Sequence, residues 1–211
     1  MKKVIITGIL GQDGSNMAER LLLKSDINCK VYGMMRRSAN PNFKNTHKFK
    51  NHPSFEFVVG DLTDQNSLDN IVESIEPDYF INFAANSFVG VSWDMPLHVM
   101  DTNASGVIRC LEAIRKFKKE CKFYSAGSSE EWGDVDYSPQ DIDHKIKPRS
   151  PYGASKAAVH QLTRVLANRL AERNININAI APGPFQSQMM NETLKKYEKE
   201  IINSVPRKRI G

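Results

Sequence analysis

Short runs of apolar and β-branched residues alternate with longer amphipathic segments along the chain. The short runs predict strands at residues 2–7, 29–35, 55–61, 79–85, 121–127 and 175–181. Between them, helical spacing of apolar residues predicts helices near residues 14–24, 66–76, 97–119 and 152–172. This alternation favours a parallel sheet with helices on both faces. Right-handed crossovers then give a doubly wound α/β fold, which binds ligands at the carboxyl ends of its strands.

Two long polar segments are predicted loops. Residues 36–54 carry many basic side chains, and residues 133–151 carry three prolines and many charges. Long loops inside a compact domain are often functional. The chain shows no internal repeat and no domain linker. We therefore expect one domain over residues 1–211, without a separate substrate domain.

Composition limits the location of the protein. No apolar run approaches the roughly 20 residues that a membrane span needs. The apolar stretch near the start breaks at Gly8, which is too early for a signal-peptide core. The three cysteines Cys29, Cys110 and Cys121 show no metal-ligand spacing and are typical of reduced thiols. We expect a cytoplasmic protein without a bound metal and without membrane partners.

The net charge of +5 is mildly basic, with basic residues gathered at 36–37, 44–50 and 207–209. Such an excess suits nucleic acid or a phosphorylated small molecule. No nucleic-acid recognition motif accompanies the charge, so we expect no nucleic-acid partner. A phosphate-bearing cofactor explains the first cluster more economically.

A glycine-rich turn follows the first predicted strand in TGILGQDGSNMAERLL. Gly8, Gly11 and Gly14 have the spacing G-x-x-G-x-x-G, and Gln12 and Asp13 lie between the last two. Glycines permit a tight turn and let backbone N–H groups approach a pyrophosphate, which the following helix N-terminus favours. Ordinary turn chemistry is the alternative. The strand before and the helix after favour a dinucleotide site.

The second predicted strand ends in GMMRRSAN. A cofactor with a free ribose 2′-hydroxyl usually meets an acidic residue at this place, whereas a 2′-phosphate favours arginine. Arg36 and Arg37 occupy it, which favours NADP over NAD. The alternative is a solvated basic loop.

The ends of the next two strands complete the predicted cofactor site. The third strand ends where an adenine edge would lie, and the fourth ends in NFAANS, whose small residues let a ribose pass close to the backbone. The expected contacts are Asp61, Leu62, Ala84, Ala85 and Ser87.

Tyr152 and Lys156 are one helical turn apart in RSPYGASKAAVHQL and therefore share one helix face. A free phenol has a pKa of about 10, and a nearby ammonium and a cationic nicotinamide favour its phenolate. The pair then shuttles a proton in a carbonyl–alcohol redox step, while Lys156 also holds the nicotinamide ribose. Ser128, at the end of the fifth predicted strand, would orient the substrate oxygen. A chance pair is the alternative.

These motifs together resemble the short-chain dehydrogenase/reductase superfamily, through TGILGQDG, NFAANS, Ser128 and YGASK. The resemblance covers essentially the whole chain and implies a Rossmann fold. Residues 1–156 resemble one extended subgroup, the GDP-mannose 4,6-dehydratases, in phrases such as MMRRSAN, VVGDLTDQNSL, EPDYFINFAANSFVGVSWDMP and SAGSSEEWGDV.

The dehydratase resemblance assigns roles to individual residues. Ser128 takes the place of the active-site threonine, Glu130 that of the general base, and Tyr152 and Lys156 are the shared pair. In that chemistry C4 of the hexose is oxidised by NADP, the base removes the acidified C5 proton as C6 loses water, and the hydride returns to C6. The alternative for Glu130 is a surface acid beside Glu131. The family has an apolar residue at the position of Glu131.

After Lys156 the resemblance changes. Residues 157–211 resemble the shorter reductase-type branch, including the 3-oxoacyl reductases. There Pro182 and Gly183 match a turn beside the nicotinamide, and Ser187 matches a hydroxyl that contacts the cofactor. No segment matches the C-terminal domain with which the extended enzymes hold their nucleotide sugar.

We therefore expect an NADP-dependent short-chain oxidoreductase, with nucleotide-sugar 4,6-dehydration as the favoured activity. A carbonyl or 3-oxoacyl reductase that uses Ser128, Tyr152 and Lys156 is the second reading. A dinucleotide-binding protein without turnover is the third. We also expect a homo-oligomer that associates through helices 97–119 and 152–172.

Overall fold

Six parallel strands form the centre of the protein. The structure is a computed structural model that describes residues 1–137, 140–141, 143–170, 177–180, 195–199 and 202. The strands are β1 (Lys2–Thr7), β2 (Cys29–Met35), β3 (Phe55–Val59), β4 (Tyr79–Asn82), β5 (Lys122–Ala126) and β6 (Ile177–Ile180). They lie in the order β3-β2-β1-β4-β5-β6, and every neighbouring pair is parallel. The order reverses beside β1, which is where a doubly wound sheet binds its ligand.

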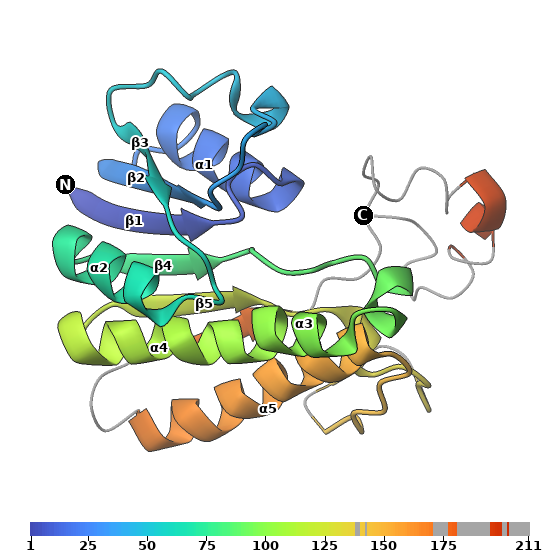
Figure 1. Cartoon of the computed structure of the whole chain (residues 1–211). Helices are drawn as coiled ribbons and strands as arrows, with labels where there is room; N and C mark the ends of the chain where they lie inside the picture. Colours follow the sequence, from blue (N-terminus) through green and yellow to red (C-terminus); the bar gives the residue numbers. More distant parts are fainter. Residues whose placement is uncertain (138–139, 142, 171–176, 181–194, 200–201, 203–211) are drawn as a thin grey trace.

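Helices cover both faces of this sheet. The helices are α1 (Gln12–Leu23), α2 (Gln65–Ile75), α3 (Pro96–Met100), α4 (Gly106–Phe117) and α5 (Pro151–Leu170). In Figure 1, α1 lies on one side of the sheet, and α2, α4 and α5 lie on the other. Along β1, Val4 and Ile6 join the apolar core under α1, while Ile5 joins the core under the other helices. Alternate side chains of one strand therefore hold the two layers together.

Local sequence sets the ends of the helices. In α2, the carboxylate of Asp64 accepts a hydrogen bond from the backbone N–H of Asn66 at 3.0 Å, which caps the first turn. The same helix ends where Glu76 takes the left-handed conformation with φ 51°. Its apolar stripe of Leu68, Ile71, Val72 and Ile75 is buried. No described helix is long and apolar enough to cross a bilayer.

The prediction of one continuous helix over 97–119 is wrong, because the segment is divided into two α-helices. A π-helical segment, Asp101–Ser105, separates α3 from α4. This wide turn contains Asn103, which is 2% exposed and bonds to Asn86 and Ser155 instead of facing solvent. π-Helical turns of this kind often occur at functional sites.

The predicted strands 55–61 and 79–85 are too long at their carboxyl ends, since β3 ends at Val59 and β4 at Asn82. After β4, the N–H of Ala84 donates to the Thr7 hydroxyl at 2.9 Å instead of to a strand carbonyl. The backbone N–H of Ala84 therefore pairs with a side chain, and the chain leaves the sheet at this point.

The predicted loop 36–54 is anchored to the core by two buried side chains, Thr46 and Phe49. It contains a short 3-10 helix, η1 (Lys44–Thr46), followed by Phe49, which is 1% exposed. The Phe49 ring meets Phe55 edge-on, with 5.0 Å between the ring centroids. One buried aromatic ring thus anchors a crossover that has no α-helix.

Gly14 offers a test of how tightly β1 and α1 are joined. A Cβ atom at Gly14 would meet the carbonyl oxygen of Gly8, which is backbone and cannot turn away. We expect Gly14→Ala to lower the free energy of unfolding by about 2 kcal/mol, as overpacking does. Urea unfolding measures this loss. Gly90→Ala is the matched control, because its Cβ would come no closer than 3.7 Å to the Phe88 ring. Equal stability of the two variants would contradict the tight junction.

Candidate functional site

The glycine turn lies between the end of β1 and the start of α1. Gly8 has φ 67°, which favours glycine, and its carbonyl accepts a hydrogen bond from the N–H of Gly11 at 2.9 Å. Helix α1 begins at Gln12, and no side chain caps its first N–H groups. Uncapped N–H groups at a helix start, approached through glycines, form a cradle for an anion. Gln12 and Asp13 are exposed at this start.

A buried chain of polar side chains links three strands behind this turn. The Thr7 hydroxyl donates to Asn82 Oδ1 at 2.6 Å, and Asn82 Nδ2 donates to Ser125 Oγ at 3.4 Å. All three side chains are at most 3% exposed. Because Thr7 also accepts from the N–H of Ala84, the chain leaving β4 is held against Gly8. A Cβ at Gly8 would lie 2.9 Å from the nitrogen of Ala84. Ala85, which follows Ala84, is half-buried, and Ser87 is exposed.

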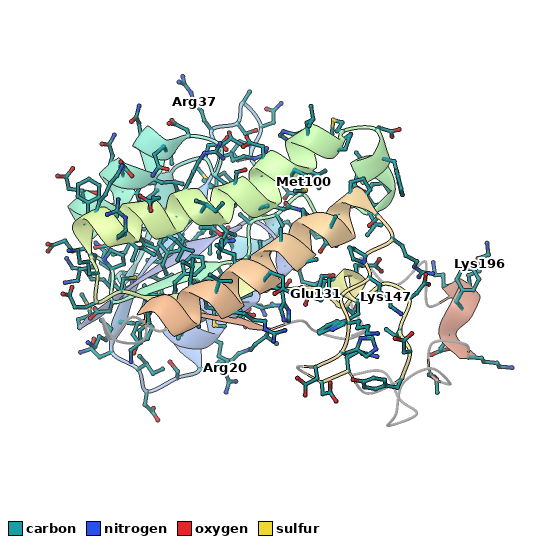
Figure 2. The ribbon with its side chains drawn as sticks, turned by 90° about the horizontal axis from the view of Figure 1, so that it is seen from below. Arg20, Arg37, Met100, Glu131, Lys147 and Lys196 are labelled. Carbon is teal, nitrogen blue, oxygen red and sulfur yellow. The ribbon has the colours of Figure 1, made fainter. Side chains whose placement is uncertain are left out.

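The two predicted arginines are exposed where β2 ends, and Figure 2 shows Arg37 pointing out from the protein. Arg36 lies close enough to Asp61 to affect the pKa of the Asp61 carboxyl group. Burial acts against the Asp61 carboxylate, but hydrogen bonds from Thr63 and the field of Arg36 hold the pKa of Asp61 below its usual value. The carboxyl ends of β2 and β3 therefore meet at one place.

Leu62 lies differently from the other predicted contacts. Its side chain is 3% exposed and belongs to the core, and its carbonyl accepts from Arg109 at 3.1 Å. A contact of Leu62 with a ligand would have to come from its backbone.

Tyr152 and Lys156 lie in the first turns of α5 and are both buried, at 8% and 5% exposure. The Lys156 Nζ lies 6.0 Å from the centroid of the Tyr152 ring and donates to the carbonyl of Ala126 at 2.8 Å. Burial lowers the pKa of Lys156 to about 8, while the charge of Glu131 acts in the other direction. The lysine amine is therefore held between the tyrosine and the end of β5.

The pKa of Tyr152 is raised, chiefly by burial, while the Ser128 hydroxyl acts in the opposite direction. The carboxylates of Glu130, Glu131 and Asp13 also raise it. The pKa of Tyr152 thus shifts in the direction opposite to the one predicted from the lysine. The effect of Asp13 shows that the glycine turn and the tyrosine share one electrostatic environment.

Ser128 and Glu130 stand at the start of a short 3-10 helix, η4 (Ser129–Glu131), which follows β5. The Ser128 hydroxyl caps this turn by accepting from the N–H of Glu130 at 3.3 Å. A Cβ at Gly153 would lie 2.6 Å from the Glu130 carbonyl oxygen, so η4 packs directly on α5. The fold brings Ser128, Glu130, Tyr152 and Lys156 together.

Sequence reasoning missed Asn103. Its Oδ1 accepts from the N–H of Asn86 at 2.7 Å, and its Nδ2 donates to the Asn86 carbonyl at 3.1 Å and to Ser155 Oγ at 3.0 Å. The Ser155 hydroxyl in turn donates to the Tyr152 carbonyl at 2.6 Å. Asn103 therefore joins the segment after β4 to the helix of Tyr152. A polar residue at a core position of a predicted helix is the signal that points to it.

Glu131 and His160 form a second feature that sequence reasoning missed. Glu131 is 1% exposed, and its Oε1 lies 3.3 Å from His160 Nδ1.

The predicted cofactor contacts Pro182 and Gly183, and the nearby Ser187, lie outside the described residues.

A model of the GDP-mannose 4,6-dehydratase family matches residues 5–206. The GDP-mannose 4,6-dehydratase of Vibrio cholerae is 40% identical over 162 residues, which cover 74% of this chain and 43% of that protein. GDP-mannose 4,6 dehydratase 1 of Arabidopsis thaliana is 39% identical over 172 residues, which cover 77% and 46%. The chain thus spans less than half the length of these two relatives. The prediction of a single domain over 1–211 and the reductase-type resemblance of 157–211 stay predictions.

Solved structures share the fold. The UDP-Glc/GlcNAc 4-epimerase of Campylobacter jejuni matches with a TM-score of 0.74 and 20% identity, over 85% of this chain and 53% of that one. The dTDP-glucose 4,6-dehydratase of Bacillus anthracis, in complex with NAD, matches with a TM-score of 0.72 and 21% identity, over 90% and 58%. These likenesses confirm the predicted Rossmann-type, doubly wound fold. The family model over residues 5–206 shows that the chain belongs to the GDP-mannose 4,6-dehydratase family.

Proposed function

We propose that the protein converts GDP-mannose to GDP-4-keto-6-deoxymannose, with NADP as its resident cofactor. The observation that carries the proposal is that Ser128, Glu130, Tyr152 and Lys156 meet beside the glycine turn. The relatives at about 40% identity carry the name of this activity. The proposed substrate is therefore a nucleotide sugar, and the site residues are proposed on geometry.

The residues present fit a dinucleotide. Gly8 and Gly14 let β1, α1 and the chain after β4 approach more closely than a Cβ would allow, and the start of α1 has no side-chain cap. The pyrophosphate would lie there, while Arg36 and Arg37 would hold a 2′-phosphate at the end of β2. Ala84, Ala85 and Ser87 would line the ribose beyond β4. When bound, NADP supplies an acceptor for the hydride of C4 and later returns that hydride to C6.

Tyr152 and Lys156 perform the proton transfer of the first step. As hydride leaves C4, the Tyr152 oxygen takes the proton of the C4 hydroxyl, which Ser128 orients by a hydrogen bond. The raised pKa of the buried phenol makes its charged form costly, so the Lys156 ammonium and a cationic nicotinamide must compensate that cost. Charge on Lys156 is therefore central to the step.

Glu130 then acts on the 4-keto sugar. The new ketone acidifies C5, and the Glu130 carboxylate takes the C5 proton while the C6 hydroxyl leaves and, with a proton, becomes water. As hydride returns to C6, the two protons taken up by Tyr152 and Glu130 balance the two that the leaving hydroxyl and C5 receive, so the overall reaction consumes no reducing equivalent. A simple reductase needs no base at this position.

We also propose self-association through the helices of 97–119 and 152–172. Leu97, Ile108 and Val165 on α3, α4 and α5 are 85%, 49% and 60% exposed. Apolar side chains of this size on neighbouring helices suit contact with a second protomer.

Glu130→Gln tests the dehydration step. We expect kcat with GDP-mannose to fall by about 10²–10⁴-fold, as when a general base is removed. Mass spectrometry follows the 4-keto-6-deoxy product, and deuterium uptake at C5 from D2O follows the proton abstraction. Glu112→Gln, an exposed acid paired with Arg115 on α4, is the control that should keep full activity. Unchanged product formation in Glu130→Gln would show that Glu130 is not the base. Oxidation of NADPH by a ketone in both variants would favour the reductase reading.

Arg36→Ala combined with Arg37→Ala tests the choice of cofactor. Hydrogen bonds to a charged group contribute about 1.5–3 kcal/mol, so we expect NADP affinity to fall about 10–100-fold and NAD affinity to change little. Titration calorimetry with both nucleotides measures the two constants. Lys50→Ala removes an exposed charge from the same loop and should change neither. An equal loss for NADP and NAD would remove the argument for the 2′-phosphate.

A further inference from the structure

A buried acid lies behind the proposed site. Glu131, the last residue of η4, is 1% exposed, and Figure 2 shows it beside helix α5. Its Oε1 lies 3.3 Å from His160 Nδ1, and the His160 ring meets the Trp132 ring edge-on at 5.9 Å between centroids. A carboxylate is rarely buried to this extent unless a positive partner compensates it. Glu131 is therefore expected to have a positively charged partner.

His160 compensates Glu131 only in part. The contact at 3.3 Å uses one carboxylate oxygen, and the other, Oε2, is buried without a hydrogen-bond partner among the described residues. Within the described part of the chain, the second carboxylate oxygen is thus left without a partner of its own.

A second positively charged group near Glu131 is Lys156. Tyr152, Lys156 and His160 follow at intervals of four residues, so they lie along one face of α5, on which η4 packs. The Lys156 amine is buried, and its hydrogen-bond partner, the carbonyl of Ala126, carries no net charge. A buried ammonium needs a negative charge nearby. Glu131 supplies one, because its field favours the charged form of Lys156. Burial raises the pKa of Glu131, whereas His160 and, to a smaller extent, Lys156 favour its charged form.

The other charged groups around α5 are engaged elsewhere. Glu130 and Asp13 act on the Tyr152 phenol. On the opposite side of α5, Asp101 in the π-helical segment is paired with Arg109 at 2.7 Å. Asp94, after the 3-10 turn η2 (Gly90–Trp93), and His98 on α3 are exposed to solvent. The described strands beside the lysine, β5 and β6, contribute Lys122, which is exposed, and no acid.

We propose that Glu131 is the counter-ion of Lys156, a positioning residue that keeps the buried ammonium charged, and that His160 helps to keep Glu131 charged. The inference rests on the proposed roles of Tyr152 and Lys156. Without Glu131 the amine loses its proton more easily, and the phenolate loses the ammonium that stabilises it. Without His160 the Glu131 carboxylate takes up a proton more easily, and the lysine loses part of its counter-ion.

The titration of Lys156 tests the inference without an activity assay. Lysines labelled with ¹³C at Cε are followed by NMR against pH, and Lys156→Met identifies the resonance. In the unmodified protein we expect a pKa of about 8. Glu131→Gln should lower this pKa by about one unit or more, the effect of removing a neighbouring opposite charge. His160→Gln should lower it by a smaller amount, because Glu131 then takes up a proton more easily, and the distant control Glu112→Gln should leave it unchanged.

The pH profile of kcat adds a second readout. We expect Glu131→Gln to lose activity at a lower pH than the unmodified protein, because the lysine deprotonates earlier, and Glu131→Asp to restore part of the range. A purely structural role would reduce kcat by the same factor at every pH.

The outcomes separate this inference from the proposed function. An unchanged Lys156 titration in Glu131→Gln overturns the counter-ion role even if the protein dehydrates GDP-mannose. If Glu131→Gln does not fold, an unchanged or higher pKa of Lys156 in His160→Gln overturns it, since that variant removes the group that helps to keep Glu131 charged. A lower pKa of Lys156 in both variants supports the role, and a protein that shows this but binds no pyridine nucleotide would contradict the proposed function alone.

Discussion

The approach of three backbone segments to within van der Waals distance is the constraint on which the site depends. Gly8 touches the chain leaving β4 on one side, at Ala84, and the first turn of α1 on the other, at Gly14. Neither contact leaves room for a Cβ atom. The Thr7 hydroxyl holds the same junction by its hydrogen bonds with Asn82 and with the N–H of Ala84. The uncapped start of α1 therefore takes its position from how β1, β4 and α1 pack.

Burial of charge is the second organising feature. Lys156 loses most of its hydration in α5, and Tyr152 loses much of its own, so the charge state of each depends on neighbours more than on solvent. The short turn η4 provides those neighbours from one side: Ser128, Glu130 and Glu131 occupy almost consecutive positions. A change in this turn therefore alters the pKa of Tyr152, through Ser128, Glu130 and Glu131, and the pKa of Lys156, through Glu131.

Much of the architecture could be predicted from periodicity. The predicted ranges of β1 and β2 agree with the structure, because each apolar run ends abruptly at a glycine or an arginine. The Tyr152–Lys156 face follows from helical spacing alone. Asn103 could not be placed this way, since its partners lie 17 and 52 residues away along the chain. A glutamate in a polar turn is expected at the surface, and its sequence neighbours do not predict that Glu131 is buried. Its contact with His160 forms only in the folded chain.

The crossover between β2 and β3 separates two tasks along one segment. Its second half is anchored by Phe49 and Thr46, which are buried, whereas Arg36 and Arg37 in its first half extend into solvent. The arginines proposed to hold the 2′-phosphate can therefore be exchanged without repacking the core. This arrangement gives evolution, and protein engineering, a route to alter nucleotide preference at small cost to folding.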